Sequence, residues 1–219
     1  MKSIFLILVL IAALPLAAQV QQLNQFGPKL GLGYYEIAYG SKTQQTDLTA
    51  TLDSLQKGGL ALDFGMTYKR RITRELSLVT GFQFGKNQVR YQENSLPAVA
   101  MMRQIFYQFS LPIGLEYNFI TENWQPFVGC YFNATKVVNS DMQYILQEAW
   151  NATTIATYLP ENTLLYGMSL MVGAQLPMTE HWTLEPAVLA AASLRSLSQS
   201  GAAQRPVNLN FQTTILYNF

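Results

Sequence analysis

The sequence predicts an all-β protein: a closed, antiparallel, up-and-down transmembrane β-barrel of about eight strands. Several segments alternate between apolar residues and polar or small ones, as strands with one apolar face do. Hydrophobic residues make up 49% of the chain and charged residues only 12%, about half the charged fraction of a soluble domain. The predicted connections alternate between short and long, as in bacterial barrels with tight periplasmic turns and longer outer loops.

The first segment has the composition of a secretory signal peptide. Lys2 supplies a positive charge, an apolar run follows from 4 to 14, and small residues end at Ala18. We therefore predict a signal peptide at 1–18 and a single outer-membrane β-barrel domain at 19–219. A retained anchor helix is the alternative, but it would need about 20 apolar residues and this run is shorter.

Charge and cysteine content narrow the possible partners. The chain has 14 basic and 13 acidic residues, a balance that does not suggest a nucleic-acid partner. Cys130 is the only cysteine, so no disulfide can form within the chain. With one histidine and one cysteine, only an all-oxygen metal site is possible, and we expect no metal and no cofactor. Cys130 lies on a weakly predicted strand and is expected to be a buried apolar side chain.

Eight strands are predicted from alternation and spacing. In the clearest one, Tyr107, Phe109 and Leu111 belong to an apolar odd-numbered face. Five segments alternate clearly: 60–68, 76–85, 105–119, 164–176 and 207–219. Three weaker segments fit the spacing: 29–39, 126–138 and 182–194. Pro186 in the last of these predicts a bulge, because proline cannot donate to the hydrogen-bond ladder.

The connections predict the orientation of the barrel. The short ones lie at 70–75, 120–125 and 177–181, and the long ones at 41–57, 92–103, 139–162 and 195–205. An even number of strands returns both ends of the barrel to the periplasmic side. In the longest connection, Ser140 and Gln143 have capping-box spacing and apolar residues recur at helical intervals. This pattern predicts a short helix, either a lid on the barrel rim or a cap that docks a partner.

A soluble eight-stranded barrel with apolar residues inside is the alternative fold. Such an interior is only just wide enough for side chains, so the bulky rows are predicted to face lipid and the polar, glycine-rich set to face the lumen. Glycines such as Gly27, Gly31 and Gly33 are expected to relieve crowding inside the barrel. The predicted lumen-facing polar network is Asp63, Lys69, Gln83, Glu116 and Glu185. An aromatic girdle is predicted near the short turns, formed by Tyr68, Tyr117, Phe119, Trp124, Trp182, Tyr217 and Phe219.

The charged residues in the lumen have two interpretations. Buried charges must be paired, which favours an internal network of ion pairs that fills the narrow barrel. The other interpretation is a proton or ion path. Lys69 lies near a strand end, so contact with water is an alternative position for its ammonium group.

The order of these segments resembles the PorT-like outer-membrane β-barrel family of Gram-negative bacteria. The similar stretches are 26–32, 59–65, 76–82, 126–129 and the aromatic strand with an internal proline at 109–117. The resemblance implies an outer-membrane barrel, and a few family members serve protein-secretion and gliding machinery. The terminal strand 207–219, ending in Phe219, resembles the signal read by the barrel-assembly machinery. We therefore expect that machinery and outer-membrane lipid as partners.

We expect no enzymatic activity and no catalytic residues. Small barrels that modify or hydrolyse lipid A typically use a histidine with a serine or an acid near the outer rim. The single histidine, His181, falls instead in a predicted periplasmic turn. The expected function is a structural or interaction role of a monomer in the outer membrane, through its outer loops and above all 139–162. A component of a secretion or envelope-assembly machinery is the alternative, and a narrow pore or a lipid-modifying enzyme is less favoured.

Overall fold

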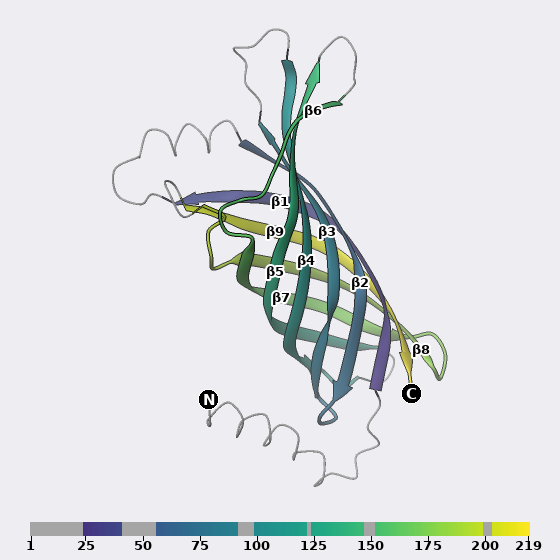
Figure 1. Cartoon of the computed structure of the whole chain (residues 1–219). Helices are drawn as coiled ribbons and strands as arrows, with labels where there is room; N and C mark the ends of the chain where they lie inside the picture. The colour runs from purple at the N-terminus through teal and green to yellow at the C-terminus, as the bar shows by residue number, and fades with distance from the viewer. Residues whose placement is uncertain (1–23, 41–55, 92–98, 122–123, 147–151, 199–202) are drawn as a thin grey trace, which may run out of the picture.

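The described residues form nine antiparallel strands, eight of which close into a barrel. The computed structural model describes residues 24–40, 56–91, 99–121, 124–146, 152–198 and 203–219. Its strands are β1 (Asn24–Gly40), β2 (Gln56–Arg71), β3 (Leu76–Tyr91), β4 (Val99–Asn118), β5 (Gln125–Leu146), β6 (Ala152–Tyr158), β7 (Leu164–Pro177), β8 (Trp182–Ser193) and β9 (Ala203–Asn218). The wall runs β1-β2-β3-β4-β5-β7-β8-β9, and β9 pairs back with β1 (Figure 1). The predicted closed antiparallel barrel of about eight strands is confirmed.

The strand pairing makes this barrel narrow. Following directly paired residues round the wall from Phe26 leads back to β1 at Glu36, ten residues further along the strand. Eight strands with this stagger tilt by about 40° and enclose an interior just wide enough for side chains. The connections at 72–75 and 178–181 lie at the same end of the barrel as the C-terminus, as do the end of β4 and the start of β5 (Figure 1). The opposite end of the strands is called here the outer end.

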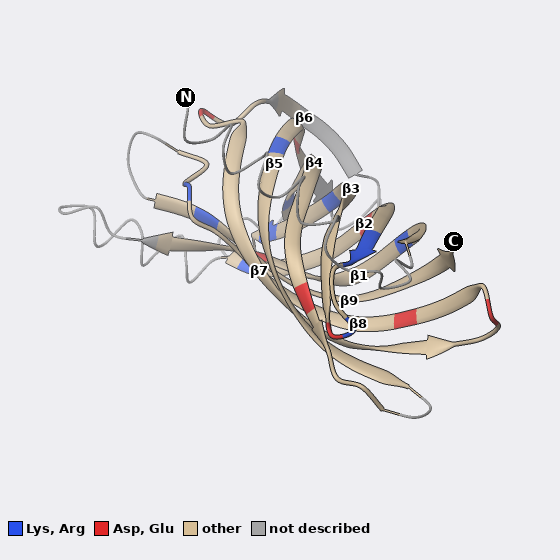
Figure 2. Ribbon diagram, turned by 90° about the horizontal axis from the view of Figure 1, so that it is seen from below, with Lys and Arg blue, Asp and Glu red and all other residues tan. Residues whose placement is uncertain are grey.

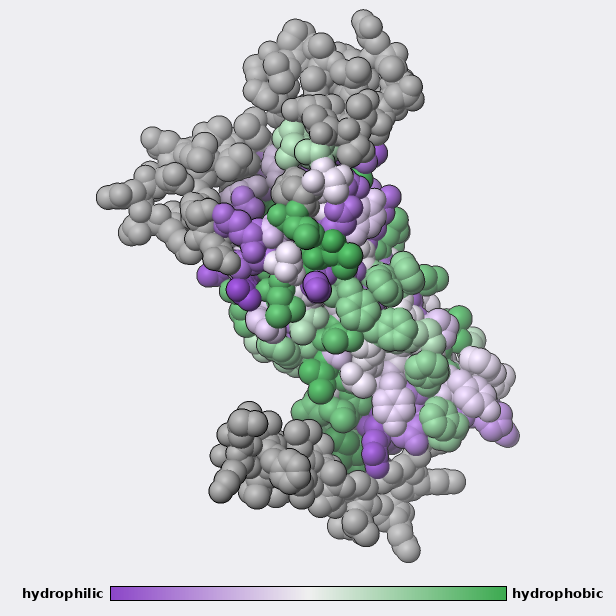
Figure 3. Space-filling view, viewed as in Figure 1, coloured by the Kyte–Doolittle hydropathy of each residue, from purple (hydrophilic) through white to green (hydrophobic). Residues whose placement is uncertain are grey.

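The wall is apolar outside and polar inside. On β7, Leu170 and Val172 are 60% and 61% exposed, whereas Ser169 is 2% exposed. Figure 3 shows the resulting hydrophobic surface across the middle of the molecule. A soluble barrel would have the opposite distribution, so that alternative does not fit. No helix in the described part of the chain is long and apolar enough to cross a membrane.

The prediction of a short helix in the longest connection is wrong for residues 140–146, because they belong to β5. They pair with the outer part of β4 on one side and with β6 on the other. Pairing with two strands satisfies the backbone groups of the segment, and this long-range gain outweighs the local helical spacing. Residues 147–151 lie outside the described part, as does the predicted signal peptide at 1–18, which stays a prediction.

The prediction of a bulge at Pro186 is also wrong. The β7–β8 pairing keeps one register from Gly173 and Ala187 to Leu176 and Leu184, and Pro186 pairs with Thr213 on β9. The missing proline N–H therefore interrupts the pairing on the β7 side without inserting a residue. The register shifts occur elsewhere, at 58/61 on β2, 99/101 and 107/108 on β4, and 142/143 on β5.

The prediction for Cys130 is wrong as well. Its side chain is exposed on the outer face of β5. Tyr131, next along the strand, is 4% exposed and faces the lumen. Because successive side chains of a strand point to opposite faces, an inward Tyr131 requires an outward Cys130.

Close approach of strands requires glycine at the inner face of β1. A Cβ on Gly33 would lie 2.2 Å from the carbonyl oxygen of Leu209, and one on Gly27 would lie 1.7 Å from that of Ile215. Both carbonyls belong to β9, the strand that closes the barrel. These glycines therefore relieve crowding where the first and last strands meet.

Candidate functional site: the lumen and the outer end

A buried ion triad crosses the lumen. Lys69 of β2 extends its Nζ to 2.5 Å from Glu116 Oε2 of β4, and it also forms an ion pair with Glu185 of β8. The three side chains are at most 2% exposed. Figure 2, which looks in from the short turns, shows charged residues on strands of opposite walls. Lys69 is thus buried and not open to water, and the triad joins β2, β4 and β8 across the lumen.

Aromatic and apolar side chains pack around the triad. Tyr131 donates its hydroxyl hydrogen to Glu116 Oε1, and the Lys69 ammonium lies 4.8 Å from the ring centroid of Phe127. Both aromatic residues belong to β5 and, with Val79 and Met171, to one buried cluster. A charge in such surroundings is stable only when it is paired and hydrogen-bonded. The arrangement supports the ion-pair interpretation over an open ion path.

A polar layer lies between the triad and the short turns. Asn118 donates to Ser77 Oγ at 3.2 Å and accepts from Gln175 Nε2 at 3.0 Å. Gln25 donates to Asn218 Oδ1 at 2.8 Å, which ties β1 to β9 near their ends. This layer fills the turn end of the lumen with hydrogen-bonded side chains.

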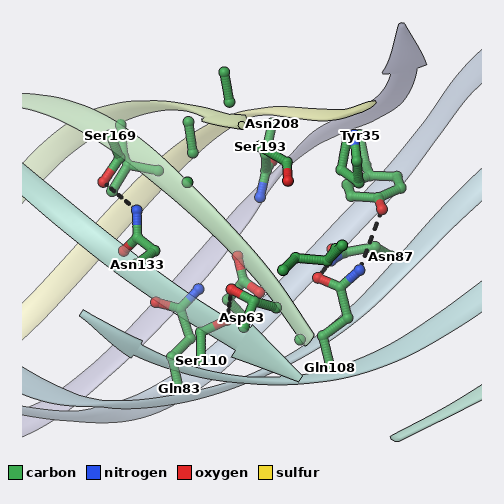
Figure 4. Close-up of a pocket in the computed structure, with 18 of the residues that line it drawn as sticks. Tyr35, Asp63, Gln83, Asn87, Gln108, Ser110, Asn133, Ser169, Ser193 and Asn208 are labelled. Carbon is green, nitrogen blue, oxygen red and sulfur yellow. Dashed lines mark hydrogen bonds between the residues drawn. The ribbon is translucent and has the colours of Figure 1, made fainter. Parts of the chain in front are cut away.

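A small polar chamber lies on the outer side of the triad, with a volume of about 90 Å³. Asp63 accepts a hydrogen bond from Asn210, and Gln83 and Asn208 also lie within hydrogen-bonding reach of it. Figure 4 shows labelled polar side chains converging on this chamber from several strands. The Oδ1 atoms of Asn87 and Asn208 have no hydrogen-bond partner in the described structure. Buried polar atoms of this kind are usually satisfied by water, and this volume suits a few water molecules.

An apolar cluster lies on the outer side of the chamber. Ile37, Phe106 and Val137 are each 1% exposed, and they pack with Tyr35 and Leu197 among others. The rings of Tyr35 and Phe106 are 6.0 Å apart. The Tyr35 hydroxyl accepts a hydrogen bond from Gln108 Nε2 at 3.2 Å, which joins this cluster to the chamber. From the turn end outward, the described lumen therefore contains a polar layer, the ion triad, the polar chamber and the apolar cluster.

The predicted lumen residues all lie inside the barrel, in two groups. Lys69, Glu116 and Glu185 form the triad, whereas Asp63 and Gln83 line the chamber. Several partners of these groups lie outside the predicted set, although their inward positions follow from the same alternation. They are Lys29, Tyr131, Asn208 and Asn210. Lys29 and Tyr131 lie on weakly predicted strands. All four residues lie on the inward face of their own strand, so listing every polar or aromatic residue on the inward faces would have included them.

The seven residues predicted as a girdle lie near the short turns. Six of them are exposed by 41–60%, and Tyr68 is half-buried. Trp182 packs edge-on against Tyr217 with ring centroids 5.1 Å apart, and Tyr117 packs in the same way against Phe119. Their collection at one level suits an interface between lipid and water.

Three strands form a sheet at the outer end of the barrel. This outer sheet comprises β4 from 99 to 106, β5 from 140 to 146, and β6, and its residues 102–106 also pair with β3. β6 ends the strand order, so its second edge has no strand partner among the described residues. Figure 1 shows these strands rising beyond the rest of the wall.

The single histidine lies at the short-turn end of the barrel. His181 is exposed in a short turn, its ring 5.8 Å from that of Tyr217, at the opposite end from the outer sheet. No three His, Cys, Asp or Glu side chains group as metal ligands in the part of the chain that the structure describes.

A closed eight-stranded wall, an apolar exterior and a filled polar lumen define the class of small transmembrane β-barrels. The chain is similar in structure to solved outer-membrane proteins. OprG from Pseudomonas aeruginosa is 13% identical, with 90% of this chain and 95% of that chain covered and a TM-score of 0.50. Neisserial surface protein A is 11% identical (89% and 97% covered, TM-score 0.47), as is the outer-membrane protease OmpT from Escherichia coli (93% and 99%, TM-score 0.42).

At 13% identity, the likeness to OprG shows the fold and nothing further. No family model and no curated protein matches the chain. The resemblance to the PorT-like family therefore stays a prediction.

Proposed function

We propose that the chain is an integral outer-membrane barrel with a sealed lumen, and that it acts as a monomer without enzymatic activity through its outer end. The observation that carries the membrane location is the exposed apolar exterior. On β9, Val207, Leu209, Phe211, Ile215 and Tyr217 are 40–57% exposed. From Val207 to Tyr217 this face covers about 26 Å along the axis at a tilt of about 40°. That height matches the apolar band of about 25 Å on known outer-membrane barrels.

The layered lumen supports a barrel that does not conduct. We expect the purified protein to give no stable single-channel steps in planar bilayers, because the ion triad and the apolar cluster each block the water path. A conducting porin inserted under the same conditions serves as the positive control. Reproducible steps of one amplitude from the wild-type protein would contradict the sealed lumen.

The outer sheet supports an interaction role. An unpaired strand edge offers a row of N–H and C=O groups, to which an extended segment of a partner can add. We expect a photo-reactive residue at Ala156, exposed on β6, to give one discrete cross-linked product in intact cells. The same residue at Glu180, exposed in a short turn, serves as the matched control. Equal products at both positions, or none at Ala156, would remove the support for this role.

A secretion or envelope-assembly role is the second candidate, favoured by the resemblance to the PorT-like family and by the same open edge. It requires in addition that deletion of the chain alters the set of exported proteins. An unchanged set would leave only the structural or interaction role.

A further inference from the structure

Cations line up on the outward face of β2, β3 and β4. In the strand register, Lys57 lies directly opposite Arg90, and Arg90 lies directly opposite Arg103. Lys86 lies four residues before Arg90 on the same face of β3, with its Nζ 5.9 Å from the ring centroid of Tyr107. We call Lys86, Arg90 and Arg103 the cation row.

The cation row borders the apolar band. Phe84, two residues before Lys86, stacks on Phe64 with centroids 5.4 Å apart and contacts Phe109 at 5.0 Å. Arg90 is about 10 Å further out along the axis than Lys86, from the strand rise and tilt. Figure 3 shows hydrophilic surface directly beyond the hydrophobic surface on this face. Lys86 thus lies at the edge of the apolar band, and Arg90 and Arg103 lie at headgroup level.

Like charges directly opposite on neighbouring strands destabilise a sheet. Arg103 donates to Gln143 Oε1 at 2.7 Å, which holds its guanidinium in place without neutralising it. No carboxylate of the described residues lies within 4 Å of Lys86, Arg90 or Arg103. Asp141, two residues before Gln143 on the same face of β5, accepts hydrogen bonds from Asn139 and Thr157 instead. An anion placed between the adjacent guanidinium groups of Arg90 and Arg103 would therefore stabilise this face.

We propose that the cation row binds the phosphate groups of an anionic outer-leaflet lipid, whose acyl chains lie against Phe64, Phe84 and Phe109. Guanidinium groups bind phosphate through two parallel hydrogen bonds, and Lys86 can extend its ammonium to the headgroups from the edge of the band. The separation between Lys86 and Arg90 suits a lipid with more than one phosphate. A lipid fits better than a soluble anion because the aromatic surface adjoins the cations at acyl-chain depth. This inference rests on the proposed membrane location.

The test uses the mature chain in nanodiscs of phosphatidylcholine doped with bisphosphorylated lipid A, with retained lipid measured by native mass spectrometry. We expect wild-type protein to retain lipid A and Arg90→Gln to bind it about tenfold more weakly, as expected for the loss of charged hydrogen bonds. Arg205→Gln is the matched control, because Arg205 is an exposed cation on β9, outside the row. Free pyrophosphate at the lipid's concentration should leave the retained lipid unchanged.

The stability of the folded barrel gives an independent test, because the difference between wild type and Arg90→Gln should reverse when lipid A is added. In phosphatidylcholine alone, Arg90→Gln should unfold at the same or a higher urea concentration than wild type, because a like-charge contact is removed. With lipid A present, wild type should be the more stable. Equal retention by Arg90→Gln, equal loss in Arg205→Gln, or displacement by pyrophosphate would overturn the inference. A wild-type chain that fails to insert, seen as unchanged gel mobility on boiling, would overturn the proposed membrane location too.

Discussion

Replacing Lys69 by methionine destabilises the folded barrel by about 3–5 kcal/mol, the cost expected when one partner of a buried ion pair is removed. The side chain is 1% exposed, and both of its carboxylate partners are equally inaccessible to water. Without the ammonium group, Glu116 and Glu185 would face each other across the lumen as uncompensated buried charges. The measurement is urea unfolding of the protein in lipid vesicles, followed by tryptophan fluorescence.

The control is the neutral triple variant Lys69→Met, Glu116→Gln and Glu185→Gln. It removes all three charges together and is expected to unfold within about 1 kcal/mol of wild type, since replacing a whole buried ionic group is often nearly neutral. This comparison separates the charge effect from a general intolerance of the position. A single variant as stable as wild type would show that the triad is not a buried ionic contact in the membrane.

Replacing Leu170 by arginine destabilises the barrel by about 2–4 kcal/mol in a bilayer, as expected for a cation on the lipid face at the midplane. Leu170 lies at the middle of β7 and is 60% exposed. At a position that open to water, a charged residue would change stability very little. The expected loss therefore depends on lipid around the barrel, and reversible unfolding in vesicles measures it.

Leu164→Arg is the matched control, because Leu164 begins the same strand at its outer end and lies on the same face. Near the interface the cost of an arginine falls to about 0–1 kcal/mol. Equal and small effects at both positions would argue against a bilayer around β7. Equal and large effects would point to packing instead of depth.

The alternation of residues was enough to predict most of the wall. It identified the outward rows around Leu111 and Leu170, and it placed Asp63, Lys69 and Glu116 on the inner face. Alternating loop lengths also predicted which end carries the short turns. The helical spacing at Ser140 to Leu146 led to a wrong prediction, because that segment forms a strand by pairing with β4 and β6.

The sequence by itself determined which face each side chain takes, since the period of a strand is two residues and the barrel has only an inside and an outside. Only the tertiary structure decided which residues meet. The contact of Lys69 with Glu116 and Glu185 joins β2, β4 and β8, and the meeting of Arg90 with Arg103 depends on the register of β3 against β4. Register is set by long-range pairing and by bulges such as the one at 58/61, and a two-residue repeat does not encode it.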